Sequence, residues 1–533
     1  MRQSNLLILN TLITYVRMAL TVGLGLLTTR LLLKVLGFDA FGLIITLGAS
    51  AGLLGLISDA LTSSAQRHLA YEIGRNDLEQ LRVVFNSVLF IFLAGGAAVV
   101  VLGSALAPIL LRILTIPAEH REASWWVLEA VLFSTALVMA GVPFVAMAEA
   151  RQAMTLTALR DLCGSMIELS IILAVMVLPG ERLINYAWLL VLGRGLLFVS
   201  FSALIIWFFP VSRPRPSLFS VQRVREIITF AGWTTLWTLG WRLRTQGATL
   251  LLNMRFGPTV NAADAIAVQV AGYQNAFGSA IYTAARPAVI SIHARGGTEP
   301  VKSLVLLASK YPSLLLCFIL VPVQIETEAL LRLWLGDYPP LTPEFVRLMT
   351  IWMGALLLSR GYHLAMLARG DLGMYTILMS AFDVLVLLCA AIGFYAFGLQ
   401  PLALPVMAVV ITLGQVWFQA WFAGRRIDLP LRKWLSQVVR PVLFVAGLGA
   451  AFAFAISRTF DEGWPRLLAL VVAYVIAVVP LIWFLGLERW ERQLFIASMS
   501  SVIRRVRGRG RQADVVGPAA DGSAGTRSTE EAE

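Results

Sequence analysis

The sequence predicts an all-α membrane protein of about 14 transmembrane helices, built as two six-helix lobes related by a repeat plus two C-terminal helices. Composition is the first observation behind this prediction. Of the 533 residues, 58% are hydrophobic and only 14% are charged, whereas soluble domains are about 45–50% apolar and about 25% charged. One aqueous core could not hide so many apolar side chains, so lipid must cover part of the surface.

The number and length of the apolar stretches are the second observation. A bilayer core of about 30 Å needs roughly 20 apolar residues per helix. The first stretch is too long for the apolar part of a signal peptide and shows no cleavage site, so we expect it to be a span. The predicted spans are 6–33, 40–65, 83–112, 124–148, 154–178, 184–209, 227–253, 262–290, 303–327, 343–367, 372–397, 401–423, 437–457 and 465–487.

The distribution of basic residues is the third observation. The net charge is +12, but the basic residues are dispersed in short runs between apolar stretches. This pattern argues against nucleic-acid binding and is typical of cytoplasmic loops. With the N-terminus inside, basic residues gather in alternate loops, as in the run from Arg213 to Arg225, whereas the loop around Gly398 has none. We therefore expect both termini to be cytoplasmic.

The first six spans resemble the next six, which predicts an internal repeat. The pair Arg17 and Arg30 is 13 residues apart, as is the pair Arg242 and Arg255, and two short strings of the first half have counterparts in the second, in the same order. Duplicated halves that face each other across a central site are the usual architecture of secondary transporters.

These observations divide the chain into six parts. We predict an N-terminal lobe at 1–210, a cytoplasmic linker at 211–226, a C-terminal lobe at 227–424 and helices 13 and 14 at 425–487. Residues 488–507 combine charges with apolar side chains, which predicts an amphipathic helix on the inner leaflet. Residues 508–533 are rich in Gly, Ala, Ser and charge, which predicts a disordered cytoplasmic tail.

Motifs for catalysis or metal binding are absent from the sequence. There is no phosphate-binding loop, the four histidines are scattered, and Cys163, Cys317 and Cys389 lie singly inside apolar stretches. Such cysteines predict neither a disulfide framework nor a metal site. No predicted outer loop is long or carries the acidic cluster that a membrane glycosyltransferase would need. We expect no enzyme activity, no cofactor and no bound metal.

Charged residues inside the spans are the candidates for function. A charge at the bilayer centre costs at least about 2.5–3.5 kcal/mol on insertion scales, so it needs a partner or an aqueous cavity. The candidates are Arg17, Arg194, Arg242, Arg244 and Arg286 among the basic residues and Asp59, Glu129, Glu168, Asp264 and Asp383 among the acidic ones.

Polar residues spaced by four and seven form a stripe along one face of the seventh span and of the eighth. The stripes consist of Arg242, Gln246 and Asn253 in the seventh span and of Asn275, Tyr282 and Arg286 in the eighth. Guanidinium groups bind phosphate oxygens in pairs and stay charged. We therefore predict a hydrated cationic cavity for a pyrophosphate-linked headgroup, formed by Arg17, Arg242, Arg244, Arg286, Gln246, Asn253, Asn275 and Tyr282.

Other interpretations of these charges stay open. Arg194 can pair with Glu168 or Glu129 as a structural contact. Asp59 and Asp383 are either counter-ions or sites of ion coupling. Arginines near span ends can reach the headgroups instead of a substrate, and these are Arg30, Arg255 and Arg360.

Short motifs near the start of the chain resemble a known family. They are Asn5 and Asn10, Thr29-Arg30-Leu31, Leu36-Gly37 and Phe41-Gly42. With the span number and the repeat, they resemble the oligosaccharide flippase family, which includes O-antigen flippases and belongs to the multidrug/oligosaccharidyl-lipid/polysaccharide exporter superfamily. The chain departs from the family late in span two, where Asp59-Ala60 replaces a frequent Gly-Leu.

The resemblance implies a function and its partners. A polyprenyl-pyrophosphate-linked oligosaccharide would move from the cytoplasmic to the outer leaflet of the bacterial inner membrane, by alternating access between two lobes, for exopolysaccharide or O-antigen synthesis. Expected partners are this lipid-linked oligosaccharide, membrane lipids, and a polysaccharide polymerase with its assembly proteins, but no nucleic acid. A peptidoglycan-precursor flippase is a variant of this hypothesis. The alternative is a cation-coupled drug or metabolite antiporter of the same superfamily, which would favour an acidic cavity.

Overall fold

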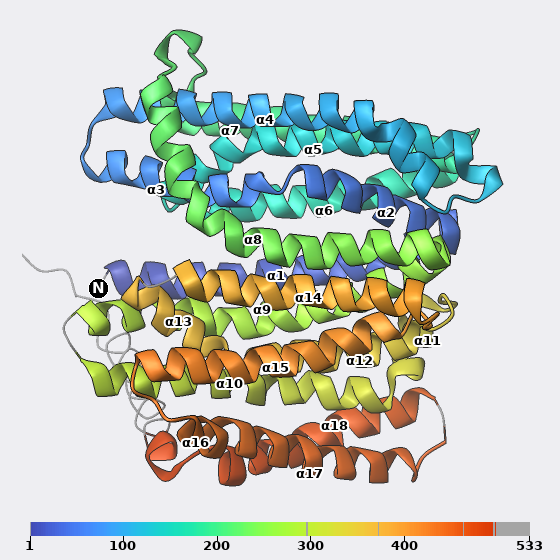
Figure 1. Ribbon diagram of the computed structural model, residues 1–533, viewed down its shortest axis with the longest axis vertical. Helices are drawn as coiled ribbons and strands as arrows, with labels where there is room; N and C mark the ends of the chain where they lie inside the picture. Colours follow the sequence, from blue (N-terminus) through green and yellow to red (C-terminus); the bar gives the residue numbers. More distant parts are fainter. Residues whose placement is uncertain (1, 295–296, 371–372, 462, 494–495, 497–533) are drawn as a thin grey trace, which may run out of the picture.

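The computed structural model describes residues 2–294, 297–370, 373–461, 463–493 and 496. Within these ranges the side chains of 2–17, 57, 231, 233–238, 277, 279–281, 283–285, 287, 288, 290, 293, 294 and 298 are not described. Across the described part of the chain the regular structure is helical throughout (Figure 1). The prediction of an all-α membrane protein of about 14 transmembrane helices is confirmed.

The first group of helices forms the N-terminal lobe, whose members are α1 (Arg2–Leu36), α2 (Phe38–Leu54), α3 (Ile57–Gly74), α4 (Leu78–Ile113), η1 (Ala118–His120), α5 (Arg121–Ala150), α6 (Met154–Val177) and α7 (Arg182–Phe208). Two short 3₁₀ turns, η2 (Pro210–Ser212) and η3 (Pro216–Leu218), connect this lobe to the rest of the chain. Its core is a continuous apolar cluster that includes Phe85, Phe92 and Phe144.

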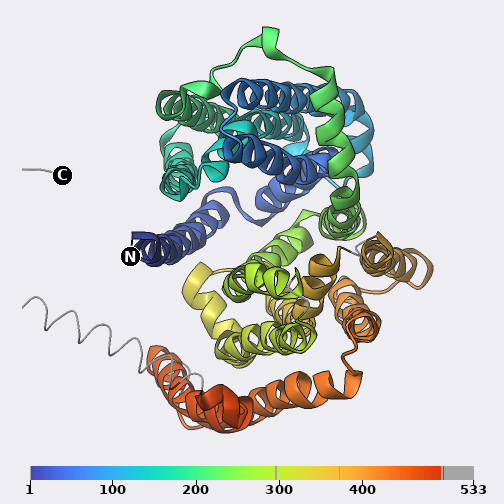
Figure 2. The same ribbon diagram turned by 90° about the vertical axis from the view of Figure 1, so that its left-hand side faces the viewer.

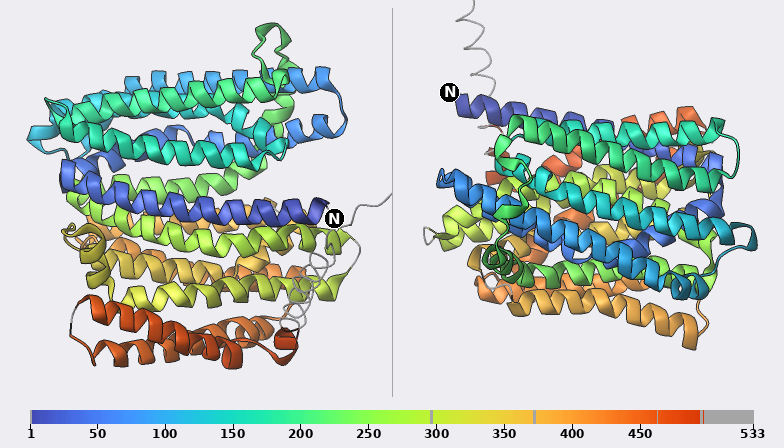
Figure 3. Two further views of the ribbon diagram at one scale, coloured as in Figure 1. Left: turned by 180° about the vertical axis from the view of Figure 1, so that it is seen from behind. Right: turned by 90° about the horizontal axis from the view of Figure 1, so that it is seen from above.

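The second group forms the C-terminal lobe. Its helices are α8 (Val221–Phe256), α9 (Pro258–Ala294), α10 (Thr298–Ile325), α11 (Thr327–Leu335), α12 (Thr342–Leu357), α13 (Arg360–Arg369), α14 (Gly373–Ala396) and α15 (Ala403–Arg426). The lobes lie side by side, with α1 and α8 along the boundary between them (Figures 2 and 3).

The last two long helices, α17 (Arg440–Ser457) and α18 (Trp464–Leu481), form a separate pair that packs on α10. The short elements α16 (Leu431–Trp434) and η4 (Leu435–Val439) precede α17, and η5 (Ile482–Gly486) follows α18. The pair shares an apolar cluster with α10, and the Tyr474 hydroxyl donates a hydrogen bond of 2.8 Å to the Cys317 carbonyl. Residues 494, 495 and 497–507 of the predicted amphipathic helix and the predicted tail 508–533 lie outside the described residues.

The hydropathy of the helices separates an apolar majority from a polar minority. Nine helices of the described chain are long and apolar enough to cross a membrane, or ten if the bent pair of α2 and α3 counts as one span. The other predicted spans correspond to α6, α8, α9 and the pair of α12 and α13. Polar and charged side chains interrupt these helices, and α8 and α9 carry both predicted stripes.

Two predicted spans are broken, and one predicted loop contains a helix. Span two was predicted to be continuous, but it bends by 53° between α2 and α3, next to Gly55. Span ten ends as α12 and restarts as α13 after Ser359. The segment between the predicted spans 303–327 and 343–367, predicted as an outer loop, contains α11. Apolar periodicity continues across such breaks, so sequence patterns do not reveal them.

The predicted repeat is visible in two equivalent turns. Gly37 joins α1 to α2 and Gly257 joins α8 to α9, both with φ of 85° and with ψ of 174° and 179°. A positive φ favours glycine, which has no Cβ to clash. We refer to the end of the bundle that carries these two turns as the far end, and to the end where α1 and α8 begin as the near end.

Candidate functional site

The site centres on α8, which has two polar faces that point in different directions. Near its start, α8 packs on α3 of the N-terminal lobe, where Arg223 lies 3.3 Å from the buried Glu72 carboxylate. Further along, α8 packs on α14 of the C-terminal lobe. Although α8 is part of the C-terminal lobe, it packs on both lobes, so side chains on one of its faces contact the N-terminal lobe.

The predicted stripe on α8 points toward the N-terminal lobe. The Gln246 amide lies against α2, since a Cβ placed on Gly52 would be 3.2 Å from it. Asn253 accepts a hydrogen bond of 2.9 Å from the Thr115 backbone N–H and is fully buried. The sequence grouped these two residues with Arg242, and the structure places all three against N-terminal elements.

Arg242 forms an ion pair across the lobe boundary. Its Nε and Nη2 atoms lie 2.9 and 2.6 Å from Oδ2 of Asp59, on the first turn of α3. The side chains are 34% and 48% exposed. Exposed pairs contribute about 0–1 kcal/mol to stability, so this pair adds little to the stability of the fold.

Arg244 points the other way and is enclosed within the C-terminal lobe. Its Nε lies 3.2 Å from Oδ1 of Asp383 on α14, and both side chains are largely buried. The guanidinium carbon lies 3.9 Å from the ring centre of Trp352 and 5.2 Å from that of Trp241, which stack on each other. Such a position suits a structural cation better than one that exchanges ligands.

A second carboxyl group belongs to the same buried cluster. Asp264, on α9, is 3% exposed, interacts electrostatically with Arg244, and has one oxygen without a hydrogen-bond partner. One arginine therefore faces two carboxyl groups, Asp264 and Asp383. A buried cluster of this kind carries a surplus negative charge unless it takes up a proton or a cation.

The stripe predicted on α9 points toward α13. The Arg360 guanidinium donates to Oδ1 of Asn275 and lies 5.2 Å above the Tyr282 ring. The Tyr282 ring stacks on that of His363 at 6.2 Å. Arg286 is exposed, pairs with no described carboxylate, and interacts electrostatically with Tyr282. The two stripes thus lie on separate surfaces, one at the lobe boundary and one within the C-terminal lobe.

Some predicted residues are placed elsewhere or cannot be placed. The Arg17 side chain lies outside the described residues, although its backbone is part of α1. Arg194 pairs with Glu168 at 2.5 Å, one of the two partners that the sequence allowed. The sequence placed Arg360 near a span end, where it can reach the headgroups instead of a substrate, and the structure shows it bound to Asn275 after the break before α13.

Apart from α8, which packs on both lobes along its length, the C-terminal lobe is joined to the N-terminal lobe mainly at the far end. Thr259 donates to Oδ1 of Asp39, Asn261 donates to Oγ1 of Thr46 at 2.6 Å, and the Trp334 indole donates to the Leu26 carbonyl at 2.8 Å. Among the described residues, every hydrogen bond that joins the N-terminal lobe to α9 or a later helix lies in the far-end half of the bundle. The described contacts therefore close the bundle at the far end.

Comparison with known proteins shows similarity in structure alone. No family model matches this sequence, and no curated protein matches it at a significant level. Among solved structures, the lipid II flippase MurJ in an inward closed conformation is similar, with a TM-score of 0.63, 13% sequence identity and coverage of 89% of this chain and 98% of that chain. This chain therefore has the same fold as that flippase.

Multidrug resistance transporters of the MATE family, within the MOP superfamily, are similar over a shorter part of the chain. An inward-facing structure gives a TM-score of 0.59 with 14% identity, covering 77% of this chain and 94% of that chain. An outward-facing structure gives 0.56 with 16% identity, covering 79% and 95%. The two lobes make up about four fifths of the sequence, so the MurJ alignment extends into the C-terminal helix pair.

Proposed function

We propose that the protein is a flippase that moves a polyprenyl-pyrophosphate-linked oligosaccharide from the cytoplasmic to the outer leaflet by alternating access. The observation that carries the proposal is Arg242, a half-exposed arginine at the lobe boundary whose partner is a half-exposed carboxylate. A cation that must bind and release an anionic substrate needs a counter-ion that it can exchange. In a permanently buried ion pair, the carboxylate would hold the arginine too tightly for this exchange.

The exchange of counter-ions gives a mechanism for headgroup binding. A diphosphate offers more acceptor oxygens and more charge than Asp59, and its hydrogen bonds to a guanidinium are charge-assisted and bidentate. When the diphosphate arrives, Arg242 leaves Asp59 and binds the phosphate oxygens. When the substrate departs, Asp59 takes Arg242 back. The carboxylate thus neutralises the empty site and promotes release.

The far-end contacts indicate which state the structure represents under this proposal. With the basic loops on the cytoplasmic side, the near end faces the cytoplasm and the far end faces outward. The lobes are then closed on the outside, and the headgroup enters from the cytoplasmic side toward Arg242. The exposed Arg286 lies about 12 Å along α9 from its near end, by helical rise, so it lies closer to this entrance than Arg242 does.

The buried cluster around Arg244 is suited to energy coupling. Two carboxyl groups facing one arginine favour the uptake of a proton or a small cation, and the cluster links α8, α9 and α14. Loss of that cation would change the repulsion between these helices. We assign substrate binding to Arg242 and Arg286, and ion coupling to Asp383 with Asp264.

A complementation experiment tests the function. A deletion strain receives wild-type protein, Arg242→Ala, Arg286→Ala or Arg225→Ala, and both surface polysaccharide and lipid-linked oligosaccharide are measured. Arg225 is the matched control because it is an exposed arginine of α8 near its start. We expect the deletion and the first two variants to lose surface glycan and accumulate intact intermediate on the inner leaflet. Normal export in the deletion strain, with no second flippase present, would overturn the proposal and favour the antiporter.

A further inference from the structure

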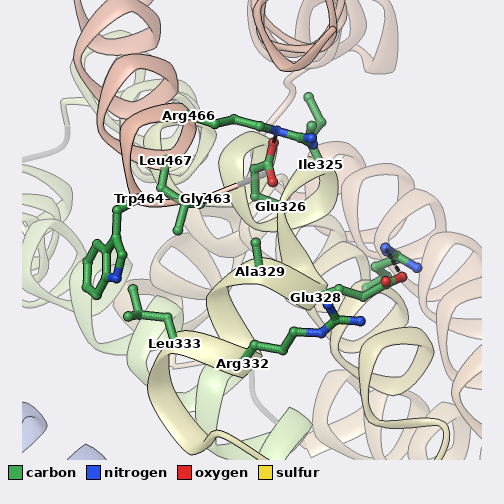
Figure 4. A pocket seen from close by; sticks show the side chains of 11 residues that line it. Ile325, Glu326, Glu328, Ala329, Arg332, Leu333, Gly463, Trp464, Arg466 and Leu467 are labelled. Carbon is green, nitrogen blue, oxygen red and sulfur yellow. Dashed lines mark hydrogen bonds and ion pairs between the residues drawn. The ribbon is translucent and has the colours of Figure 1, made fainter. Parts of the chain in front are cut away.

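A pocket at the far end of the C-terminal lobe has no role in the function proposed above. Its volume is about 630 Å³, and it lies between the end of α10, α11, α12 and the start of α18 (Figure 4). Ala329, on α11, lies among its lining residues. Ligand sites for small molecules usually have volumes of about 300–1,000 Å³, so the pocket can hold a ligand of that class.

One wall of the pocket is made of charged side chains, and one ion pair among them is largely buried. The buried Glu326 carboxylate, 4% exposed, lies 2.6 Å from Nε of Arg466, and Glu328 lies 3.3 Å from Nη2 of Arg347. Arg332 also lines the pocket and has no ion-pair partner among the described residues. Two arginines, Arg466 and Arg347, are neutralised by the two glutamates. The positive charge of Arg332 therefore remains for an anionic group.

The other wall is apolar and contains an exposed aromatic ring. Trp464 is 62% exposed, although it lines the pocket together with Leu333 and Leu467. Figure 4 shows the indole on one side of Ala329, Glu328 and the Arg332 guanidinium on the other, and the pair of Glu326 and Arg466 above Ala329. An aromatic ring presents an apolar face and an N–H donor at its edge. Opposed polar and apolar walls suit a ligand that has an apolar face and a polar rim.

The C-terminal helix pair supplies the residues that complete the pocket. Trp464 and Arg466 begin α18, while Glu326 follows α10. The apolar cluster between α10 and this pair holds the two walls in register. Breaking a buried ion pair costs about 3–5 kcal/mol, so the contact between Arg466 and Glu326 keeps the start of α18 in place. The C-terminal helix pair thus supplies one side of the pocket, which neither lobe contains by itself.

We propose that this pocket binds the saccharide part of an acidic oligosaccharide, with a sugar ring on Trp464 and a carboxylate or phosphate substituent on Arg332. Sugar rings have an apolar C–H face and a rim of hydroxyl groups, which matches the two walls. The proposal rests on the flippase function, because it places the pocket on the outer side, where the flipped glycan emerges. The pocket then holds the glycan while the lipid remains in the bilayer.

A binding measurement tests the pocket directly. The full-length protein is placed in phosphatidylcholine nanodiscs. The probe is the oligosaccharide that mild acid releases from the host's polyprenyl-linked glycans, and binding is measured by titration with native mass spectrometry. Trp464→Ala and Arg332→Gln are expected to weaken binding at least tenfold. The matched controls, Trp188→Ala and Arg112→Gln, change an exposed tryptophan and an exposed arginine at the far end of the N-terminal lobe and are expected to bind like wild type.

Three results would overturn the inference. They are absence of probe binding to the wild-type protein, equal binding by the two pocket variants and wild type, and complete displacement of the probe by phosphatidylglycerol in the nanodisc. The last result would identify a lipid-headgroup site. Failure of the flippase function is distinguishable, because it is measured as normal glycan export in the deletion strain. Normal export in the deletion strain would overturn the flippase function but not the binding of the probe by the pocket. The three binding results would overturn the pocket proposal but not the flippase function.

Discussion

The Asp59 carboxylate holds the Arg242 guanidinium from across the lobe boundary, at 2.6 Å, although both side chains remain partly exposed. The bend between α2 and α3 places Asp59 on the first turn of α3, beside the middle of α8. This pair connects a residue of each lobe, and neither side chain is fully enclosed by the protein. The proposed counter-ion exchange follows from that accessibility.

Asp59→Asn tests whether Asp59 is a counter-ion or a coupling site. If it only competes with substrate for Arg242, the variant is expected to keep glycan export and to bind lipid-linked oligosaccharide several-fold more tightly, because the exposed pair contributes about 0–1 kcal/mol. Binding is measured on purified protein, and Glu79→Gln, an exposed acid at the start of α4, is the control. Lost export with normal expression would instead assign ion coupling to Asp59.

A reversible cross-link at the far end tests alternating access. Asp39 and Thr259 are hydrogen-bonded across the lobes, so Asp39→Cys with Thr259→Cys is expected to form a disulfide in a background without Cys163, Cys317 and Cys389. The closed far end would then be locked, and glycan export would stop until reductant is added. Full export by the oxidised, cross-linked protein would contradict alternating access.

Gly42 sets how closely the lobes approach. A Cβ at this position would lie 1.9 Å from the Pro258 carbonyl oxygen, whereas a Cβ at Gly48 of the same helix meets nothing within 4 Å. Gly42→Ala is therefore expected to destabilise the closed far end by about 1–3 kcal/mol and to lower the yield of the disulfide described above. Gly48→Ala is the matched control. Equal cross-linking by both variants would show that the lobes do not need this approach.

The cluster around Arg244 predicts opposite effects for its two carboxyl groups. Asp383→Asn removes the partner of a buried arginine and is expected to destabilise the protein by about 3 kcal/mol. Asp264→Asn removes the surplus negative charge and is expected to leave the melting temperature unchanged or raised, while export loses its dependence on the ion gradient. Thermal unfolding in detergent and export with collapsed gradients measure the two effects. A larger loss of stability for Asp264→Asn would reverse these roles.

The segment after α18 is anchored by a buried ion pair. Nζ of Lys310 lies 2.6 Å from Oε2 of Glu491, and both side chains are 2% exposed. Glu491→Ala leaves a buried, unpaired ammonium group and is expected to cost about 3–5 kcal/mol, whereas the double change Lys310→Met with Glu491→Met is expected to be close to neutral. Limited proteolysis after residue 486 reports the release of the segment. Equal protection of the wild type, Glu491→Ala and the double variant from the protease would show that the ion pair of Lys310 and Glu491 does not anchor the segment.

Much of the architecture could be predicted from residue patterns. The apolar stretches predicted the spans, because lipid requires a long apolar run in every crossing helix. The repeat also was predictable, and the equivalent turns at Gly37 and Gly257 confirm it. The breaks at Gly55 and Ser359 were not, since hydrophobicity continues through them. Consequently the contact of Arg360 with Asn275 was missed. The short helix α11 was also missed, because its segment was predicted as a loop.

The candidate site divides in the same way. Spacing correctly grouped residues by helix face, because helical periodicity depends on the local chain alone. It did not reveal that the two stripes point toward different neighbours, nor that Arg244, two residues after Arg242, is buried between tryptophan rings. No spacing signal could have found the far-end pocket, whose walls come from residues 325–347 and 463–467.

The sequence by itself determined that this protein is a polytopic helical membrane protein with duplicated halves and several intramembrane arginines. Those properties follow from the solvent that each segment meets and from local helix geometry. The tertiary structure decided which arginine faces a carboxylate across the lobes, which is enclosed, and which end is closed. These outcomes depend on how each helix is rotated against its neighbours, and side-chain packing between segments distant in the chain sets that rotation.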